Sequence, residues 1–118
     1  MDKKRILLVD DEESIQLLYR EEFEEEGYSV DSARNGFEAL EKFRANPPDL
    51  VVLDINMPGM NGIEVLRQMK ELRATMPVIL NSAYQEYKQD FGSWASEAYV
   101  VKSANMDELK ATVRKYLS

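Results

Sequence analysis

Histidine and cysteine are both absent from this chain of 118 residues. Without histidine there is no Ser-His-Asp triad, no histidine-ligated zinc and no histidine general base. Without cysteine, disulfides, thiolate metal sites and cysteine nucleophiles are excluded as well. Any chemistry must therefore depend on carboxylates, hydroxyls and lysines.

Long apolar runs and an excess of positive charge are also missing. No apolar stretch approaches membrane-spanning length, and residues 1–5 lead directly into an expected strand rather than into the core of a signal peptide. We therefore expect a cytoplasmic protein without membrane association. The 15 basic residues are outnumbered by 22 acidic ones. The net charge of −7 argues against direct nucleic-acid binding, because phosphate contacts need clustered Lys and Arg.

The remaining composition, with 44% hydrophobic residues, is typical of a single globular domain over residues 1–118. Apolar runs predict strands over residues 5–9, 28–33, 50–53, 77–81 and 98–102. Five helices are expected between and after them: over residues 12–26, from Asn35 to Pro47, from Asn61 to about Arg73, from Ser82 to about Ser96, and after Asn105.

This alternation predicts an α/β fold with one doubly wound, flavodoxin-like parallel sheet of five strands and five helices. Only the strand at residues 28–33 alternates apolar and polar positions, as an edge strand should, so the order 2-1-3-4-5 fits best. Capping-box spacing starts helices at Asn35, Asn61 and Asn105. The side chains expected to face the core from the helices are Ile15, Leu18, Tyr19, Phe23, Phe37, Leu40, Phe43, Ile63, Leu66, Met69, Leu72, Leu109, Val113 and Leu117.

Five polar residues stand at the carboxyl ends of four adjacent strands: Asp10, Asp11, Asp54, Ser82 and Lys102. In an open α/β sheet these ends meet at one edge, where ligands bind. Three carboxylates so close repel one another and require a cation, and hard oxygen ligands without His or Cys favour Mg²⁺ or Mn²⁺. With a lysine and a hydroxyl beside them, the group is suited to phosphoryl transfer, with Asp54 as the reactive carboxylate.

Each residue taken alone has an ordinary structural explanation. Asp10 and Ser82 have the spacing of helix caps, and Lys102 could be an exposed lysine at a strand end. Their shared placement at one sheet edge favours a functional site instead.

Four motifs carry a family resemblance. They are residues 8–12 (Leu-Val-Asp-Asp-Glu), 53–62 (Leu-Asp-Ile-Asn-Met-Pro-Gly-Met-Asn-Gly), 81–83 (Asn-Ser-Ala) and 98–102 (Ala-Tyr-Val-Val-Lys). Along its whole length the chain resembles the receiver domain of the response regulators of two-component signal transduction.

The resemblance implies that Asp54 accepts a phosphoryl group from a phosphohistidine on a sensor histidine kinase or a histidine phosphotransfer protein, as in a phosphorelay. Mg²⁺, for which Mn²⁺ can substitute, would be held by Asp11, Asp54 and the carbonyl of Asn56, with Asp10 acting through water. Lys102 and the Ser82 hydroxyl would bind the phosphoryl oxygens.

The family also implies a switch. Ser82 and Tyr99 would rearrange on phosphorylation, and Asn56 and Tyr84 would tune hydrolysis of the acyl phosphate. The face formed by the helix after Ser82, the strand at 98–102 and the last helix would signal to a downstream effector domain or protein, with a phosphorylation-dependent homodimer as one outcome. The chain would catalyse only its own phosphorylation and dephosphorylation.

Two departures from the family pattern qualify these expectations. Lys102 is followed by Ser103 instead of a cis proline, so the peptide between them is either trans or strained. The interval from Ser82 to Lys102 is short, and Trp94 within it is either a core residue or an exposed contact.

Three other functions are considered. A docking module that has lost phosphorylation shares the fold. A phosphatase of the haloacid-dehalogenase type needs a second acid where this chain has Asn56. An FMN binder of flavodoxin type is disfavoured because the acids after the first strand repel phosphate.

Overall fold

The computed structural model describes residues 3–83, 95–103 and 105–118. Its strands form one parallel sheet in the order β2-β1-β3-β4-β5, as the sequence predicts. The strands are β1 (Arg5–Val9), β2 (Ser29–Ala33), β3 (Leu50–Leu53), β4 (Val78–Ser82) and β5 (Ala98–Val101). The helices within the described residues are α1 (Glu13–Glu25), α2 (Gly36–Ala45), α3 (Gly62–Leu72) and α4 (Asp107–Leu117).

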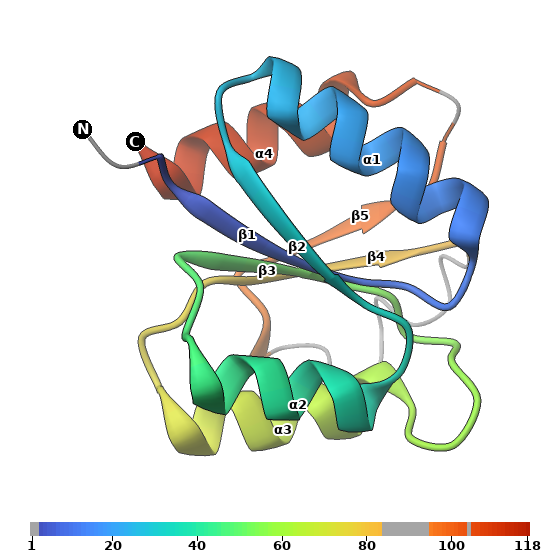
Figure 1. Cartoon of the computed structure of the whole chain (residues 1–118), viewed down its shortest axis with the longest axis vertical. Coiled ribbons are helices and arrows are strands. Elements are labelled where there is room, and N and C mark those ends of the chain that lie inside the picture. The colour runs from blue at the N-terminus through green and yellow to red at the C-terminus, as the bar shows by residue number, and fades with distance from the viewer. Residues whose placement is uncertain (1–2, 84–94, 104) are drawn as a thin grey trace.

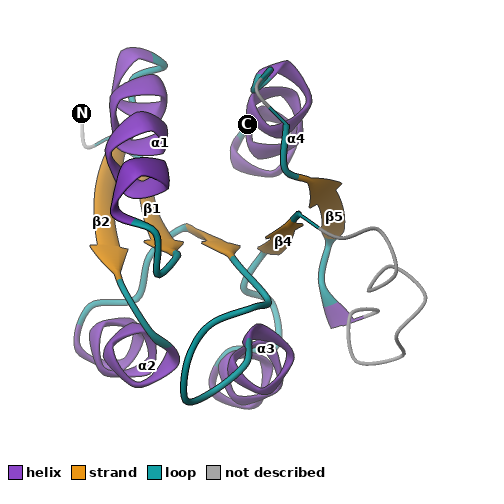
Figure 2. Ribbon diagram, turned by 90° about the vertical axis from the view of Figure 1, so that its right-hand side faces the viewer, coloured by secondary structure: helices purple, strands orange, loops and turns teal. Residues whose placement is uncertain are grey.

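The helices cover the sheet in two layers. Helices α1 and α4 lie on one face of the sheet, and α2 and α3 lie on the other (Figures 1 and 2). The described residues thus contain four helices rather than five. The fifth was expected between Ser82 and Ser96, and residues 84–94 of that segment lie outside the described part of the chain. No helix within the described ranges is long and apolar enough to cross a membrane.

Burial on both faces explains why the central strands are continuously apolar. In β1, Leu7 and Val9 belong to the core beneath α2 and α3, whereas Ile6 and Leu8 belong to the core beneath α1 and α4. All four residues of β3 and all five of β4 are buried in the same alternating way. β2, at the edge, keeps the polar alternation that the sequence predicts.

Two of the three predicted helix caps are confirmed. The backbone N–H of Glu38 donates to Asn35 Oδ1 at 2.8 Å, and that of Glu64 donates to Asn61 Oδ1 at 3.1 Å. The prediction for the last helix is wrong, because α4 begins only at Asp107. Asn105 Oδ1 accepts the N–H of Asp107, two residues along, so it closes a turn that leads into the helix.

Three of the predicted core positions are wrong. Leu18 is 44% exposed, Phe37 63% and Leu72 45%. In α2 the buried stripe consists of Gly36, Ala39, Leu40 and Phe43, one position away from Phe37. A one-residue step rotates a side chain about 100° around the helix, so residues at the margin of a stripe face solvent even when they are apolar.

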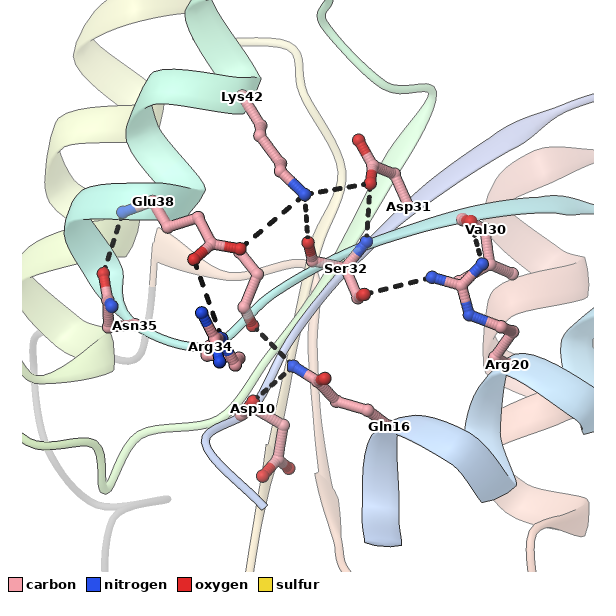
Figure 3. Close-up of polar contacts among 11 residues, drawn as sticks. Asp10, Gln16, Arg20, Val30, Asp31, Ser32, Arg34, Asn35, Glu38 and Lys42 are labelled. Carbon is pink, nitrogen blue, oxygen red and sulfur yellow. Dashed lines mark hydrogen bonds and ion pairs between the residues drawn. The ribbon is translucent and has the colours of Figure 1, made fainter. Parts of the chain in front are cut away.

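The outer edge of β2 is covered by side chains from two helices (Figure 3). Arg20 of α1 donates to the carbonyl of Val30 at 3.0 Å, and Lys42 of α2 donates to that of Ser32 at 2.6 Å. Alternate residues of a parallel strand bond to the same side, and these two carbonyls face away from β1. Both cations therefore satisfy acceptors that an open sheet edge would otherwise offer to another strand.

Candidate functional site

The site lies at the carboxyl edge of the sheet, which Figure 2 views end-on. Backbone hydrogen bonds hold the residues after neighbouring strands in register. The N–H of Asp54 donates to the carbonyl of Val9 at 2.9 Å, and the N–H of Lys102 donates to that of Ser82 at 2.7 Å. The backbone positions from which these polar side chains extend are therefore set by the hydrogen bonds of the sheet.

Three carboxylates meet at this edge. Asp10, Asp11 and Asp54 each offer an oxygen, and these oxygens all lie within 4.8 Å of one another. Asp10 is 2% exposed and Asp54 is 5% exposed, whereas Asp11 lies at the surface. Two buried acids and one exposed acid form a pocket of negative charge with an open side, and that arrangement suits a cation entering from solvent.

Lys102 is the basic residue of the cluster. Its Nζ lies 2.8 Å from Asp10 Oδ2 and 3.6 Å from Asp54 Oδ2, and its side chain is 13% exposed. The exposed-lysine explanation of Lys102 is thus wrong. Glu12 also comes within 4.0 Å of Nζ, a contact that the sequence reasoning missed because adjacent acids do not reveal which one turns toward the lysine.

Burial controls the ionisation of the phosphoacceptor candidate. Desolvation, together with the charges of Asp10 and Asp11, raises the pKa of Asp54 from 3.8 to about 6, although Lys102 and the backbone N–H of Asn56 act in the opposite direction. Burial by itself would lower the pKa of Lys102, but its hydrogen bond to Asp10 and the charge of Asp54 raise it instead. With a pKa of about 6, the Asp54 carboxyl group is mostly ionised at neutral pH.

Asp10 also accepts hydrogen bonds through its side chain and its backbone carbonyl. Its Oδ1 accepts the N–H of Glu12 at 2.9 Å, and its backbone carbonyl accepts a bond from Gln16 Nε2 at 2.6 Å, as Figure 3 also shows. The cap position of α1 is Glu12, with no side-chain cap. Asp10 thus shapes the turn before the helix while its other oxygen faces Lys102.

The other predicted residues differ in their burial and in whether the structure describes them. Ser82 is fully buried at the end of β4, and Asn56 is exposed in the loop after Asp54. Tyr99 is partly buried and packs against the core on the α2 and α3 side. Tyr84, like Trp94, lies outside the described residues.

The peptide bond after Lys102, where the family pattern has a cis proline, is described by the structure. No cis peptide occurs among the described residues, and the bond from Lys102 to Ser103 is therefore trans. Lys102 nonetheless reaches both buried acids. A cis proline is not needed to bring this lysine to the site.

Gly62 is a second contributor that the sequence reasoning did not single out for the site. A Cβ at this position would lie 2.2 Å from the carbonyl oxygen of Asp54. Helix α3 therefore starts directly against the backbone that carries the central carboxylate, and only glycine permits this approach. In the sequence, the feature that indicates this close approach is the glycine that directly follows Asn61.

The donor set suits a hard divalent cation. The candidate ligands are the carboxylates of Asp10, Asp11 and Asp54 at two strand ends, and the chain contains neither His nor Cys. Mg²⁺ and Mn²⁺ prefer such ligands, and a bound cation would offset the negative charge that Lys102 alone leaves on three carboxylates.

Comparison with known sequences identifies the family. The model of the response regulator receiver domain matches residues 6–114. Sporulation initiation phosphotransferase F of Bacillus subtilis is 39% identical over 119 residues, which cover 99% of this chain and 96% of that protein. The alkaline phosphatase synthesis regulator PhoP of the same organism is 37% identical, and the match covers 97% of this chain but 48% of PhoP. The chain thus spans about half the length of this second relative.

Comparison with solved structures leads to the same family. The response regulator TrrA of Thermotoga maritima, in complex with Mg²⁺ and BeF, superposes with a TM-score of 0.95 at 52% identity, covering 97% of this chain and 99% of TrrA. TrrA in complex with the histidine kinase ThkA gives a TM-score of 0.92 at 52% identity, covering 98% and 99%. Family model, relatives and fold lead to one conclusion: this chain belongs to the response regulator receiver domain family.

Proposed function

We propose that this chain is a phosphorylation-switched signalling module in which Asp54 accepts a phosphoryl group from a phosphohistidine on a partner protein. The observation that carries the proposal is the meeting of three carboxylates, those of Asp10, Asp11 and Asp54, with Lys102 beside them. An oxygen of Asp54 attacks phosphorus while the P–N bond to histidine breaks, and the electron pair of that bond stays on the ring nitrogen. When the other ring nitrogen of the partner histidine carries a proton, the products are an aspartyl phosphate and a neutral imidazole. The similarity to TrrA, which was solved in complex with a histidine kinase, supports a kinase as the donor.

The metal is Mg²⁺, with Mn²⁺ as a substitute. Asp11, Asp54 and the carbonyl of Asn56 would hold it, and Asp10 would act through water. When bound, the cation supplies positive charge that offsets the negative charge on the phosphoryl oxygens. Burial and the neighbouring acids raise the pKa of Asp54 to about 6, whereas Lys102 favours its ionised form, and this pKa still lies below neutral pH.

Lys102 and Ser82 would bind the phosphoryl oxygens. Lys102 Nζ is 3.6 Å from Asp54 Oδ2, so a group added to that carboxylate comes within its reach. Ser82 contributes a hydroxyl donor from the adjacent strand end. The new dianion draws this hydroxyl toward it, and Tyr99 turns inward to fill the space that is left. Asn56 and Tyr84 tune the rate at which the acyl phosphate is hydrolysed.

The output is a change in the face formed by the segment after Ser82, β5 and α4. This face would engage a downstream effector domain or protein, and a phosphorylation-dependent homodimer is one form the output takes. We place the domain, residues 1–118, in the cytoplasm, where it catalyses its own phosphorylation and dephosphorylation and no other reaction.

The test is intact-mass spectrometry after incubation with acetyl phosphate and Mg²⁺, followed by a phosphorylated histidine donor. The native chain and Asp31→Ala, which removes an exposed aspartate of β2, should each gain one phosphoryl group. Asp54→Ala should gain none, and chelation of Mg²⁺ should abolish the adduct in every variant. Absence of an adduct from both donors would reject the proposal and favour a module that only docks.

A further inference from the structure

The side-chain amide of Gln16 joins the ends of two strands beside the acidic cluster. Its Nε2 donates to the backbone carbonyl of Asp10 at 2.6 Å and to that of Ala33 at 2.9 Å (Figure 3). Both partners are acceptors only, so the reverse orientation of the amide would set Oε1 against two carbonyl oxygens. The partners therefore fix the orientation of this amide, and both of its N–H groups are used.

These bonds lie where the chain leaves the sheet. The N–H of Asp10 donates to the carbonyl of Ala33 at 3.1 Å, the same acceptor that Gln16 uses. Asp11 follows between β1 and α1, and α1 starts at the cap residue Glu12 without a side-chain cap. The turn that carries the acids is thus held at Asp10, through its N–H, its Oδ1 and the carbonyl that Gln16 binds.

The bond to the Asp10 carbonyl also affects Asp11. The Asp10 carbonyl and the Asp11 N–H belong to one planar peptide unit, so rotating this unit would break the bond from Gln16 and move the Asp11 side chain. Asp11 is exposed, so packing does not hold its carboxylate, and the nearby carboxylates of Asp10 and Asp54 repel it. Gln16 therefore opposes this repulsion through the backbone.

Gln16 makes these contacts because of its place near the start of α1. Its backbone N–H donates to the carbonyl of Glu12 at 3.1 Å, so its main chain belongs to the helix. Long side chains on a helix point back toward its N-terminus, which carries the amide toward the turn before α1. Methionine has a similar length and helix propensity but no N–H groups, so Gln16→Met removes the two bonds and keeps the helix.

We propose that Gln16 is a positioning residue for the cation site. By holding the Asp10 carbonyl, it keeps the Asp11 carboxylate directed toward the carboxylates of Asp10 and Asp54. This role rests on the proposed function, in which Asp11 is a ligand of Mg²⁺. Gln16 acts through the backbone and not by contact with the cation. Loss of a group that orients a metal ligand typically weakens metal binding by about tenfold or more.

Mn²⁺ is the probe, because electron paramagnetic resonance measures the free ion directly as the unphosphorylated chain is titrated. Gln16→Met should bind Mn²⁺ about tenfold more weakly than the native chain. Gln68→Met makes the same exchange on α3, on the opposite face of the sheet, where the amide contacts Met60 Sδ at 3.9 Å, and should bind as the native chain does. Urea unfolding of all three chains separates an effect on metal affinity from an effect on stability.

Each outcome has a distinct meaning. Equal Mn²⁺ affinity in the native chain and in folded Gln16→Met would overturn the role of Gln16 and leave the proposed function standing. An equal loss in Gln68→Met would also overturn it, by showing that any exchange of this kind loosens the site. If the native chain bound no Mn²⁺, the cation site of the proposed function would be rejected, and this role with it.

A second measurement on the native chain decides the matter if Gln16→Met does not fold. The side-chain N–H protons of Gln16 donate to carbonyls beside the acids, so titration with Mg²⁺ should shift their magnetic resonance signals. The corresponding signals of Gln68 should stay in place. Unchanged Gln16 signals at saturating Mg²⁺ would overturn the proposal.

Discussion

The buried charge on Asp54 should cost the native fold stability, and Asp54→Asn should recover it. Asparagine has the shape of the carboxyl group and remains neutral, so it mimics protonated aspartate in place. The pKa of Asp54 rises from 3.8 to about 6 on folding because of burial, with further contributions from Asp10 and Asp11. An acid whose pKa is raised by folding destabilises the native state wherever it is ionised.

The size and the pH window follow from the two pKa values. The difference of about 2 units corresponds to about 3 kcal/mol at 1.36 kcal/mol per unit. The penalty is absent below pH 3.8, grows as the pH rises, and is complete above pH 6. Asp54→Asn should therefore raise the free energy of unfolding by about 3 kcal/mol at pH 7.5 and by about 1 kcal/mol at pH 4.5.

Urea unfolding followed by far-UV circular dichroism in the presence of a chelator measures this difference at both pH values. Glu41→Gln, which removes one charge from the exposed side of α2, is the control and should change stability little at either pH. A gain for Asp54→Asn that is the same at pH 4.5 and 7.5 would show that charge burial is not its cause. No gain at pH 7.5 would mean that Lys102 fully compensates the carboxylate.

Two further substitutions test how the site and the sheet edge are built. Gly62→Ala should lower the free energy of unfolding by about 2 kcal/mol in urea titrations, because the added Cβ would lie 2.2 Å from the Asp54 carbonyl oxygen. Helix propensity alone predicts that alanine stabilises the helix, so a stabilised variant would contradict this geometric argument. Lys42→Met should expose the carbonyl of Ser32 at the edge of β2 and so increase self-association, measured by sedimentation velocity. The control Lys115→Met, on α4, should not change self-association. If the two variants self-associate to the same extent, the lysine is not needed to protect the edge of β2.

Much of the fold was predictable because the sheet is buried on both faces. A strand such as β3, covered by helices on each side, must be apolar at every position, so Leu50–Leu53 is conspicuous in the sequence. Polar residues that interrupt such runs stand at the strand ends by necessity. Because parallel strands end at the same edge, the meeting of Asp10, Asp54 and Lys102 followed from their places in the sequence.

The tertiary structure decided the features that depend on distances between elements. Only the packed chain shows that Lys102 lies closer to Asp10 than to Asp54, and that α3 starts against the backbone of Asp54 at Gly62. The exposure of Phe37 was set in the same way, because the packed helix α2 buries Gly36, Ala39, Leu40 and Phe43 and leaves Phe37 outside that stripe.

The surroundings of Asn81 give the clearest case. In the sequence, Asn81 is one polar residue at the end of an apolar strand, next to a serine with an evident role. Its burial and its hydrogen bond to Tyr19 arise only when α1 packs on the sheet. Sequence periodicity reports which face of an element is buried, whereas the space left between elements depends on how their side chains fit together, and that is settled only by packing.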